Sequence, residues 1–202
     1  SGNYYPVNRG QKEGINNIMR YSGGGDYILY VGTIEPRKNI KTLLKAFRVV
    51  RDTLKVKLIL AGGKGWKFDD ILKMPQELGI QKDVAFTGYV DEKTILYLYN
   101  YASVVVYPSI YEGFGLPVIE AMSCGTPVVI SDIPSLREVA GKAALSFNPW
   151  DHEELADKIE EILTSTGLSD ELMIKGLQRS KEYSWDKTVS STIHSYKRVL
   201  EE

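Results

Sequence analysis

Cysteine is almost absent from this sequence, and long hydrophobic runs are absent altogether. Cys124 is the only cysteine in 202 residues, so an internal disulfide is excluded and a reducing compartment suits the chain. No apolar run approaches the roughly eighteen residues of a membrane-spanning helix. The first residues have neither the basic start nor the apolar core of a signal peptide. We therefore expect a cytoplasmic protein.

The chain also lacks an excess of charge of either sign and a set of metal ligands. Lys and Arg number 25 against 26 Asp and Glu, so no nucleic-acid partner is expected and any phosphate site must be local. No Asp-x-Asp pair occurs, and Asp69-Asp70 falls in a helical stretch. Neither His152 nor His194 has a second ligand at helical spacing. We expect no metal.

Two glycine-rich nucleotide motifs are missing as well. Around Gly63, a triphosphate-binding loop would need a glycine five residues earlier, where Leu58 stands. It would also need Ser or Thr after Lys64, where Gly65 stands. No G-x-G-x-x-G occurs anywhere, so a nicotinamide or flavin cofactor is unsupported.

The sequence that is present alternates short β-branched runs with helical patterns, which predicts an α/β fold. A Gly-rich break at residues 22–26 separates an N-terminal segment, residues 1–26, from one domain, residues 27–202. We expect a Rossmann-like parallel sheet of about six strands with helices on both faces, and ligands outside the carboxyl ends of the strands. The expected strands are 27–32, 57–61, 84–87, 104–107, 127–131 and 144–147. A short amphipathic stretch lies near 11–20, and the expected helices lie near 39–53, 67–78, 91–101, 116–124, 134–140, 151–165, 168–182 and 185–200.

The most informative segment runs from Glu112 to Glu120, Glu-Gly-Phe-Gly-Leu-Pro-Val-Ile-Glu. Gly113 and Gly115 allow the backbone to approach a ligand closely, and Pro117 suits the first helical position. The free amides of a helix start attract phosphate oxygens, while carboxylates accept from hydroxyls. The segment therefore favours a ligand with a sugar attached to a phosphate. The alternative interpretation is a turn with two solvated glutamates.

With seven residues between them, Glu112 and Glu120 resemble the Glu-x7-Glu signature of the retaining glycosyltransferases of family four, which have the GT-B fold. Six more blocks resemble that family in order: residues 31–39, 60–63, 86–90, 107–109, 125–129 and 183–185. The resemblance covers about residues 27–200. It implies the C-terminal, nucleotide-sugar-binding half of a two-domain enzyme whose N-terminal acceptor domain is missing from this chain.

The exit of the first expected strand carries two cations. Asn39 is a plausible helix N-cap, so Arg37 and Lys38 stand just before a helix start and could converge on one anion. A solvated basic loop is the plainer interpretation. The resemblance implies that Lys38 contacts the donor diphosphate. Many family members carry Arg where this chain has Thr33, so Arg37 is the candidate for the second cation.

The resemblance also implies roles for the rest of the expected donor site. Gly62 would open space beside the donor, or form a plain strand-to-helix turn. The backbone at Tyr89 and Val90 would bind the nucleobase, with packing as the alternative role of the Tyr89 ring. Glu120 would hold the ribose and Glu112, the expected catalytic residue, would face the transferred sugar. The amides of Gly113, Phe114, Gly115 and Leu116 would meet sugar hydroxyls and phosphate.

These roles together predict a glycosyltransferase that moves a sugar from a nucleotide diphosphate sugar to a glycan or lipid-linked acceptor. The donor is a co-substrate, and neither a cofactor nor a metal is expected. GDP-mannose is the favoured donor and a UDP-sugar the next. A related sugar-nucleotide epimerase and a non-catalytic nucleotide-binding module remain as alternatives. The chain alone is expected to be inactive, and the full-length protein could lie at the inner membrane surface.

The last expected helix has an apolar stripe, formed by Val189, Ile193, Tyr196 and Leu200, with Ser184 as its cap. In GT-B enzymes the last helix crosses back to the N-terminal domain. We therefore expect part of this stripe to lack its partner here. The helix would then either self-associate, with residues near 11–20 taking part, or fray.

Overall fold

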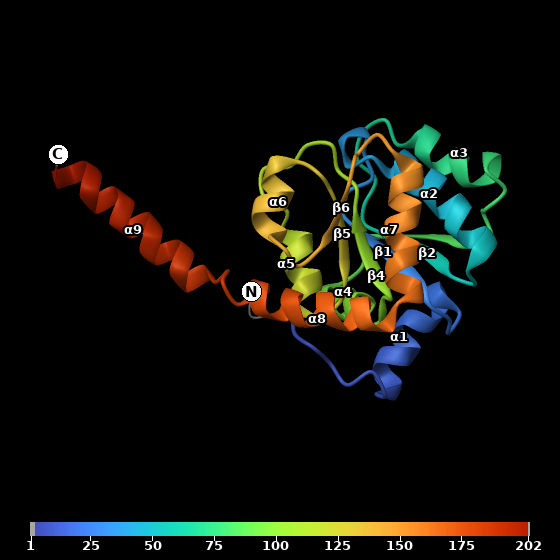
Figure 1. Ribbon diagram of the computed structural model, residues 1–202, viewed down its shortest axis with the longest axis horizontal. Helices are drawn as coiled ribbons and strands as arrows, with labels where there is room; N and C mark the ends of the chain where they lie inside the picture. Colours follow the sequence, from blue (N-terminus) through green and yellow to red (C-terminus); the bar gives the residue numbers. More distant parts are fainter. Residues whose placement is uncertain (1–2, 202) are drawn as a thin grey trace.

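Six parallel strands form one sheet in the order β3-β2-β1-β4-β5-β6 (Figure 1). The structure is a computed structural model that describes residues 3–201. The strands are β1 (Tyr27–Val31), β2 (Lys57–Ala61), β3 (Val84–Gly88), β4 (Val104–Tyr107), β5 (Val128–Ser131) and β6 (Leu145–Phe147). Each differs from its expected range by no more than one residue at either end. The α/β class and the six-stranded parallel sheet are confirmed.

Helices cover both faces of the sheet. The helices α2 and α7 pack together on one face, while α1, α4, α5 and α6 lie on the other (Figure 1). The helices are α1 (Lys12–Ser22), α2 (Ile40–Thr53), α3 (Asp69–Glu77), α4 (Glu92–Tyr101), α5 (Leu116–Ser123), α6 (Pro134–Ala140), α7 (His152–Thr164), α8 (Thr166–Ser180) and α9 (Trp185–Glu201), with a 3-10 turn, η1, at Pro36–Lys38. All the expected helices exist.

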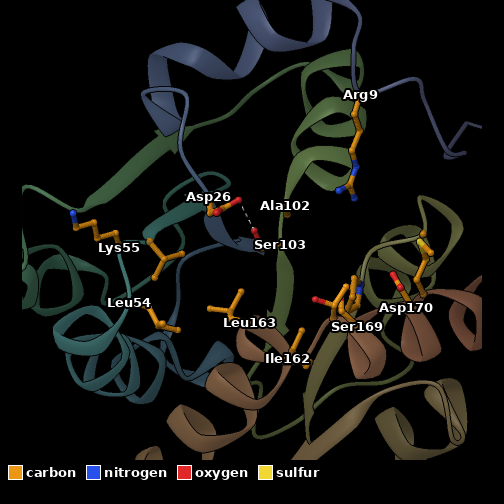
Figure 2. A pocket seen from close by; sticks show the side chains of 15 residues that line it. Arg9, Asp26, Leu54, Lys55, Ala102, Ser103, Ile162, Leu163, Ser169 and Asp170 are labelled. Carbon is orange, nitrogen blue, oxygen red and sulfur yellow. Dashed lines mark hydrogen bonds between the residues drawn. The ribbon is translucent and has the colours of Figure 1, made fainter.

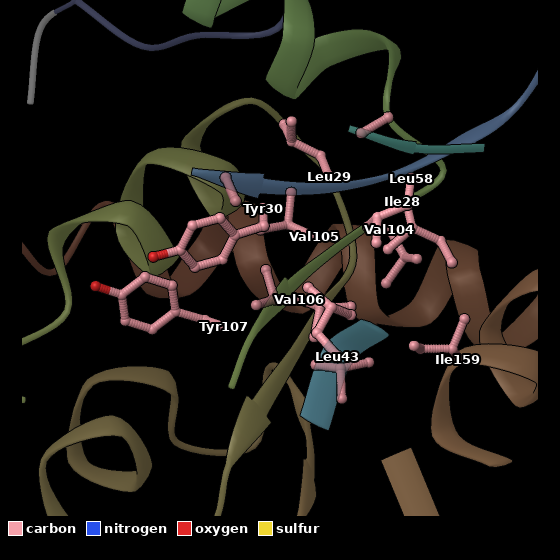
Figure 3. Close-up of a cluster of buried hydrophobic side chains, with 14 of the residues drawn as sticks. Ile28, Leu29, Tyr30, Leu43, Leu58, Val104, Val105, Val106, Tyr107 and Ile159 are labelled. Carbon is pink, nitrogen blue, oxygen red and sulfur yellow. The ribbon is translucent and has the colours of Figure 1, made fainter. Parts of the chain in front are cut away.

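The central strands are apolar along their whole length because helices bury them from both sides. Ile28, Leu58 and Val104 have no exposed surface, and Leu43 of α2 and Ile159 of α7 pack over the same face (Figure 3). β-branched side chains suit this environment, since their restricted rotamers pack well on a pleated surface. The core therefore holds the strand ends in fixed positions.

The strand order reverses between β1 and β4, and this places two distant parts of the chain side by side. Ile28 pairs with Val104 and Leu29 with Val105. After β1 the chain continues towards β2, whereas after β4 it continues towards β5 on the opposite side. Such a switch point leaves a crevice at the carboxyl edge of a parallel sheet, where ligands bind.

The final helix, α9, projects away from the rest of the molecule (Figure 1). Ser184 caps it as expected, since the Ser184 hydroxyl accepts a hydrogen bond from the amide of Lys187 at 3.2 Å. The side chains of Val189, Ile193 and Tyr196 are all exposed. The expected loss of partners thus extends along the whole stripe. Self-association through this helix stays a prediction.

A buried and an exposed isoleucine, both in helices, allow the effect of packing on stability to be measured. Ile159 in α7 is fully buried, whereas Ile193 in α9 is 49% exposed. Ile159→Ala should lower the free energy of unfolding by about 2–5 kcal/mol, because it leaves a cavity in the core. The matched change Ile193→Ala should alter it by no more than about 0.5 kcal/mol. Chemical denaturation measures both, and an equal loss in the two variants would show that α9 packs on the domain.

Candidate functional site

The loops that leave β1 and β4 meet at the switch point. The amide of Ile110, after β4, donates to the carbonyl of Arg37, after β1, at 3.0 Å. The Arg37 guanidinium also donates to the carbonyl of Tyr111 at 3.3 Å. These bonds fix the two loops to each other. Arg37 and Lys38 thereby become neighbours of Glu112, which is 75 and 74 positions away from them in the sequence.

Lys38 and Glu112 form an ion pair where these two loops meet. The Lys38 Nζ lies 2.5 Å from Glu112 Oε1, and both side chains are only 9% exposed. The same ammonium donates to the Tyr107 hydroxyl at 2.9 Å. Arg37 reaches the other carboxylate oxygen of Glu112, with Nη1 3.3 Å from Oε2. A carboxylate thus sits between two cations, and one of the cations is nearly buried.

The neighbours of Glu112 lower its pKa. Burial by itself would raise the pKa of this carboxyl, but hydrogen bonds from neighbouring side chains, that of Lys38 first, and the charge of Lys38 together outweigh burial, so that the pKa lies below its usual value of 4.5. Glu112 is therefore ionised at neutral pH. Its negative charge in turn stabilises the positive charge of Arg37, whose pKa is raised.

Arg37 is more accessible than Lys38. Its side chain is 43% exposed, and its Nε lies 2.6 Å from the carboxylate of Glu35. Asn39 stands at the N-cap position of α2, but its side chain does not cap the helix. The backbone of Asn39 is left-handed, with φ of 56°. Its side-chain Nδ2 donates instead to the carbonyl of Pro149 at 2.7 Å. The predicted N-cap position of Asn39 is thus confirmed, although its side chain makes no hydrogen bond to the first amides of the helix.

The start of α5 presents backbone amides next to this cluster. Among the residues described, 3–201, the amides of Gly113, Phe114, Gly115 and Leu116 donate to no acceptor. Gly115 has φ of 109°, and a Cβ there would lie 2.6 Å from Leu136 Cδ2, so glycine is required. Leu116 begins the helix, which puts Pro117 at the second helical position rather than the predicted first.

Glu120 lies one turn further along α5 in a different environment. Its carboxylate accepts a hydrogen bond of 2.9 Å from the Tyr99 hydroxyl. Burial raises the pKa of Glu120, and no cation is paired with it among the ion pairs of the described residues. Glu120 lines a cavity of about 760 Å³ together with Tyr4, Glu92 and Trp185. Phe114 and Leu116 line the same cavity.

Comparison with known proteins agrees with this geometry. Residues 13–179 match the sequence profile of the family described as "Glycosyl transferases group 1". The chain is 39% identical over 201 residues to O-antigen chain mannosyltransferase B of Escherichia coli, covering 98% of this chain and 52% of that protein. It is 34% identical to the serotype-specific mannosyltransferase WbdA of Escherichia coli, covering 90% of this chain and 23% of that protein. The chain belongs to the group 1 glycosyltransferases.

Solved structures place the chain within these proteins. Sucrose-phosphate synthase from Thermosynechococcus elongatus is similar with a TM-score of 0.84 and 28% identity, over 99% of this chain and 50% of that one. The C-terminal domain of LpcC from Francisella tularensis is similar with a TM-score of 0.76 and 19% identity, over 90% of this chain and 95% of that one. The chain spans about half or less of the curated relatives named above. It thus has the fold of the C-terminal domain of a group 1 glycosyltransferase.

Gly62, Tyr89 and Val90, which the family resemblance also assigns to the donor site, differ in their surroundings. Gly62, with φ of 152°, packs against β1, and a Cβ there would overlap the carbonyl oxygen of Gly32. This close approach supports the turn as one reason for the glycine. Tyr89 is 89% exposed, so its ring does not pack as the alternative predicted. Val90 is partly buried against the core. None of the three lines the cavity beside Glu120.

Three tyrosines of this group 1 glycosyltransferase were missed as site residues by the sequence analysis. Tyr107 contacts Lys38, Tyr99 holds Glu120, and the Tyr4 ring packs edge-on against Tyr99 with centroids 5.6 Å apart. Tyr107 ends β4 at the carboxyl edge, and that position was a usable signal. Tyr4 had none, because the placement of the N-terminal segment depends on tertiary packing.

A separate cavity of about 400 Å³ opens at the other edge of the sheet (Figure 2). Arg9, Asp26 and Ser103 line it, and Asp26 and Ser103 stand directly before β1 and β4. It therefore lies at the amino ends of the strands, away from Lys38 and Glu112. Within residues 3–201, no group of three or more His, Cys, Asp or Glu could hold a metal ion. No helix in that range is long and apolar enough to cross a membrane.

The two glutamates should have opposite effects on stability as the pH changes. The folded-state pKa of Glu112 is lowered, so its contribution is present above pH 4.5 and is lost as the pH falls below that value. The folded-state pKa of Glu120 is raised, so its ionisation should reduce stability as the pH rises above 4.5. Thermal unfolding between pH 3 and 8 should show Glu112→Gln weakening the domain mainly at neutral pH, and Glu120→Gln strengthening it there relative to acid. The same pH slope in both variants would contradict these environments.

Proposed function

We propose that this chain is the donor-binding half of a retaining mannosyltransferase that moves mannose from GDP-mannose to a glycan or lipid-linked acceptor. The observation that carries the proposal is the cluster of Lys38, Arg37 and Glu112 beside the free amides at the start of α5. Relatives named as mannosyltransferases favour this sugar. A UDP-sugar is the next candidate, because the similar HepE structure from Anabaena holds UDP and glucose.

The donor diphosphate would lie between the cations and the start of α5. Lys38 offers a point charge from a nearly buried position, and Arg37 offers a planar fork from a half-exposed one. The amides of residues 113–116 add donors with the positive end of the helix dipole behind them. These fixed groups would stabilise the charge that develops on the departing diphosphate, so the proposed reaction uses no metal.

Each of the two glutamates would bind a different sugar of the donor. Glu112 would leave its ion pair, accept from hydroxyls of the transferred mannose and stabilise positive charge at the anomeric carbon. Glu120, held by Tyr99, would accept from the ribose hydroxyls. The backbone at Tyr89 and Val90 would bind the base, and the exposed Tyr89 ring leaves that backbone accessible. Gly62 would leave room beside the donor.

The acceptor and the remaining catalytic groups would come from an N-terminal domain outside this chain. The relatives are longer than the chain, which leaves space for such a domain. In this proposal the isolated chain binds donor but transfers no sugar. The full-length enzyme would work on the cytoplasmic side, with its acceptor at the inner membrane surface.

A nucleotide panel tests the proposal. The chain is mixed with GDP-, UDP- and ADP-sugars, and its melting temperature is recorded, because a ligand stabilises the folded state by RT ln(1 + [L]/Kd). We expect the largest increase with GDP-mannose. No increase with any nucleotide sugar would refute donor binding, and a larger increase with UDP-glucose would replace the proposed donor.

Removing the Lys38 ammonium tests whether this residue contacts the diphosphate. Lys38→Ala should weaken GDP binding by about 1.5–3 kcal/mol, the usual range for a hydrogen bond to a charged group, and should affect GMP much less. Isothermal titration calorimetry measures both ligands. Lys41→Ala, which removes an exposed cation at the start of α2, is the matched control and should change neither affinity. Equal losses for GDP and GMP would move the diphosphate elsewhere.

Removing Glu120, in contrast, should weaken the binding of the two nucleotides equally. Glu120→Ala should weaken GDP and GMP alike, by about 1.5–3 kcal/mol, because both contain the ribose. Calorimetry with the two nucleotides measures the change, and Glu92→Ala controls for loss of negative charge in the same cavity. If Glu120→Ala binds GMP as tightly as the parent chain, Glu120 does not hold the ribose.

A further inference from the structure

Two tyrosines stack at the carboxyl ends of β1 and β4, directly below the ion pair. The rings of Tyr30 and Tyr107 have centroids 6.3 Å apart and planes 15° apart. Both are buried, and both hydroxyls point towards the same side of the strands (Figure 3). The two side chains are therefore close equivalents in size, burial and position.

Their hydroxyls have different partners. The Tyr30 hydroxyl donates to the carbonyl of Thr33 at 3.0 Å, a backbone group that the proposed function does not assign to the donor. The Tyr107 hydroxyl accepts from the Lys38 ammonium at 2.9 Å. Burial raises the pKa of Tyr107 further above its usual value, so this hydroxyl is neutral. Only Tyr107 holds a group that the proposed function assigns to the donor.

The proposed reaction requires the Lys38 ammonium to change its partner. In this structure the ammonium is paired with Glu112, yet the proposed reaction needs Glu112 at the transferred sugar and Lys38 at the diphosphate. An ammonium on a four-carbon stem is mobile once its partner leaves, and holding it costs entropy. It has three N–H donors, so one can remain on Tyr107 while another passes from Glu112 to a phosphate oxygen.

We propose that Tyr107 is a positioning residue, whose hydroxyl holds the Lys38 ammonium in place while that ammonium exchanges the Glu112 carboxylate for the donor diphosphate. This inference rests on the proposed function. Being neutral, the hydroxyl orients Lys38 without competing for its charge. The exchange also links the two roles, because the diphosphate that takes Lys38 releases Glu112 towards the sugar.

The test compares Tyr107→Phe with Tyr30→Phe, which lose the same atom from two stacked rings. Calorimetry with GDP, UDP and GMP is run on the parent chain and both variants, and thermal unfolding checks that each is folded. Tyr107→Phe should weaken the binding of the preferred diphosphate by about three- to tenfold, the effect of one hydrogen bond, and leave GMP unchanged. Tyr30→Phe should leave the binding of all three nucleotides unchanged.

A double-mutant cycle separates positioning from a general structural effect. In the Lys38→Ala background, Tyr107→Phe should cause no further loss of diphosphate affinity, because the group it positions is gone. The same loss with and without Lys38, or an equal loss in Tyr30→Phe, would overturn the proposal while leaving donor binding intact. If the parent chain binds neither GDP nor UDP, the proposed function fails and this inference fails with it.

Discussion

The pairing of β1 with β4 is the constraint on which the site depends. Lys38 follows β1 and Glu112 follows β4, and the chain forms β2 and β3 between these two strands, so only the pairing of β1 with β4 makes the two residues neighbours. The apolar residues buried on both faces fix this pairing, and the loops above it are tied by the bond from Ile110 to Arg37. Packing in the core thus sets the distance between the opposite charges of Lys38 and Glu112.

The charge of the site is local, in a chain whose net charge is only −1. Lys38 and Glu112 are both nearly buried, and a buried charge needs a partner because desolvation is costly. In the free domain the two residues serve as each other's partner. A bound diphosphate would take over the role of Glu112, so the same low exposure that favours the ion pair would also strengthen the hold on the donor. Glu120, which has a tyrosine instead of a cation, stays outside this exchange.

Most of the fold was predictable because its signals are local. The β-branched runs gave all six strands, and glycine and proline marked their ends. The segment from Glu112 to Glu120 was found for the same reason. Side-chain partners were harder to predict, since they depend on residues far apart in sequence. The ion pair that engages Glu112, the left-handed backbone of Asn39 and the exposure of Tyr89 all follow from how loops pack after the sheet has formed.

Amide hydrogen exchange with and without a nucleoside diphosphate tests most directly whether the donor binds at the switch point. The account predicts slower exchange at residues 113–116 and at residues 37–39 when the ligand is present, and no change at residues 54–56 and 102–103, which line the cavity at the other edge of the sheet. The account would be contradicted by slower exchange at that other edge alone, with residues 113–116 unchanged.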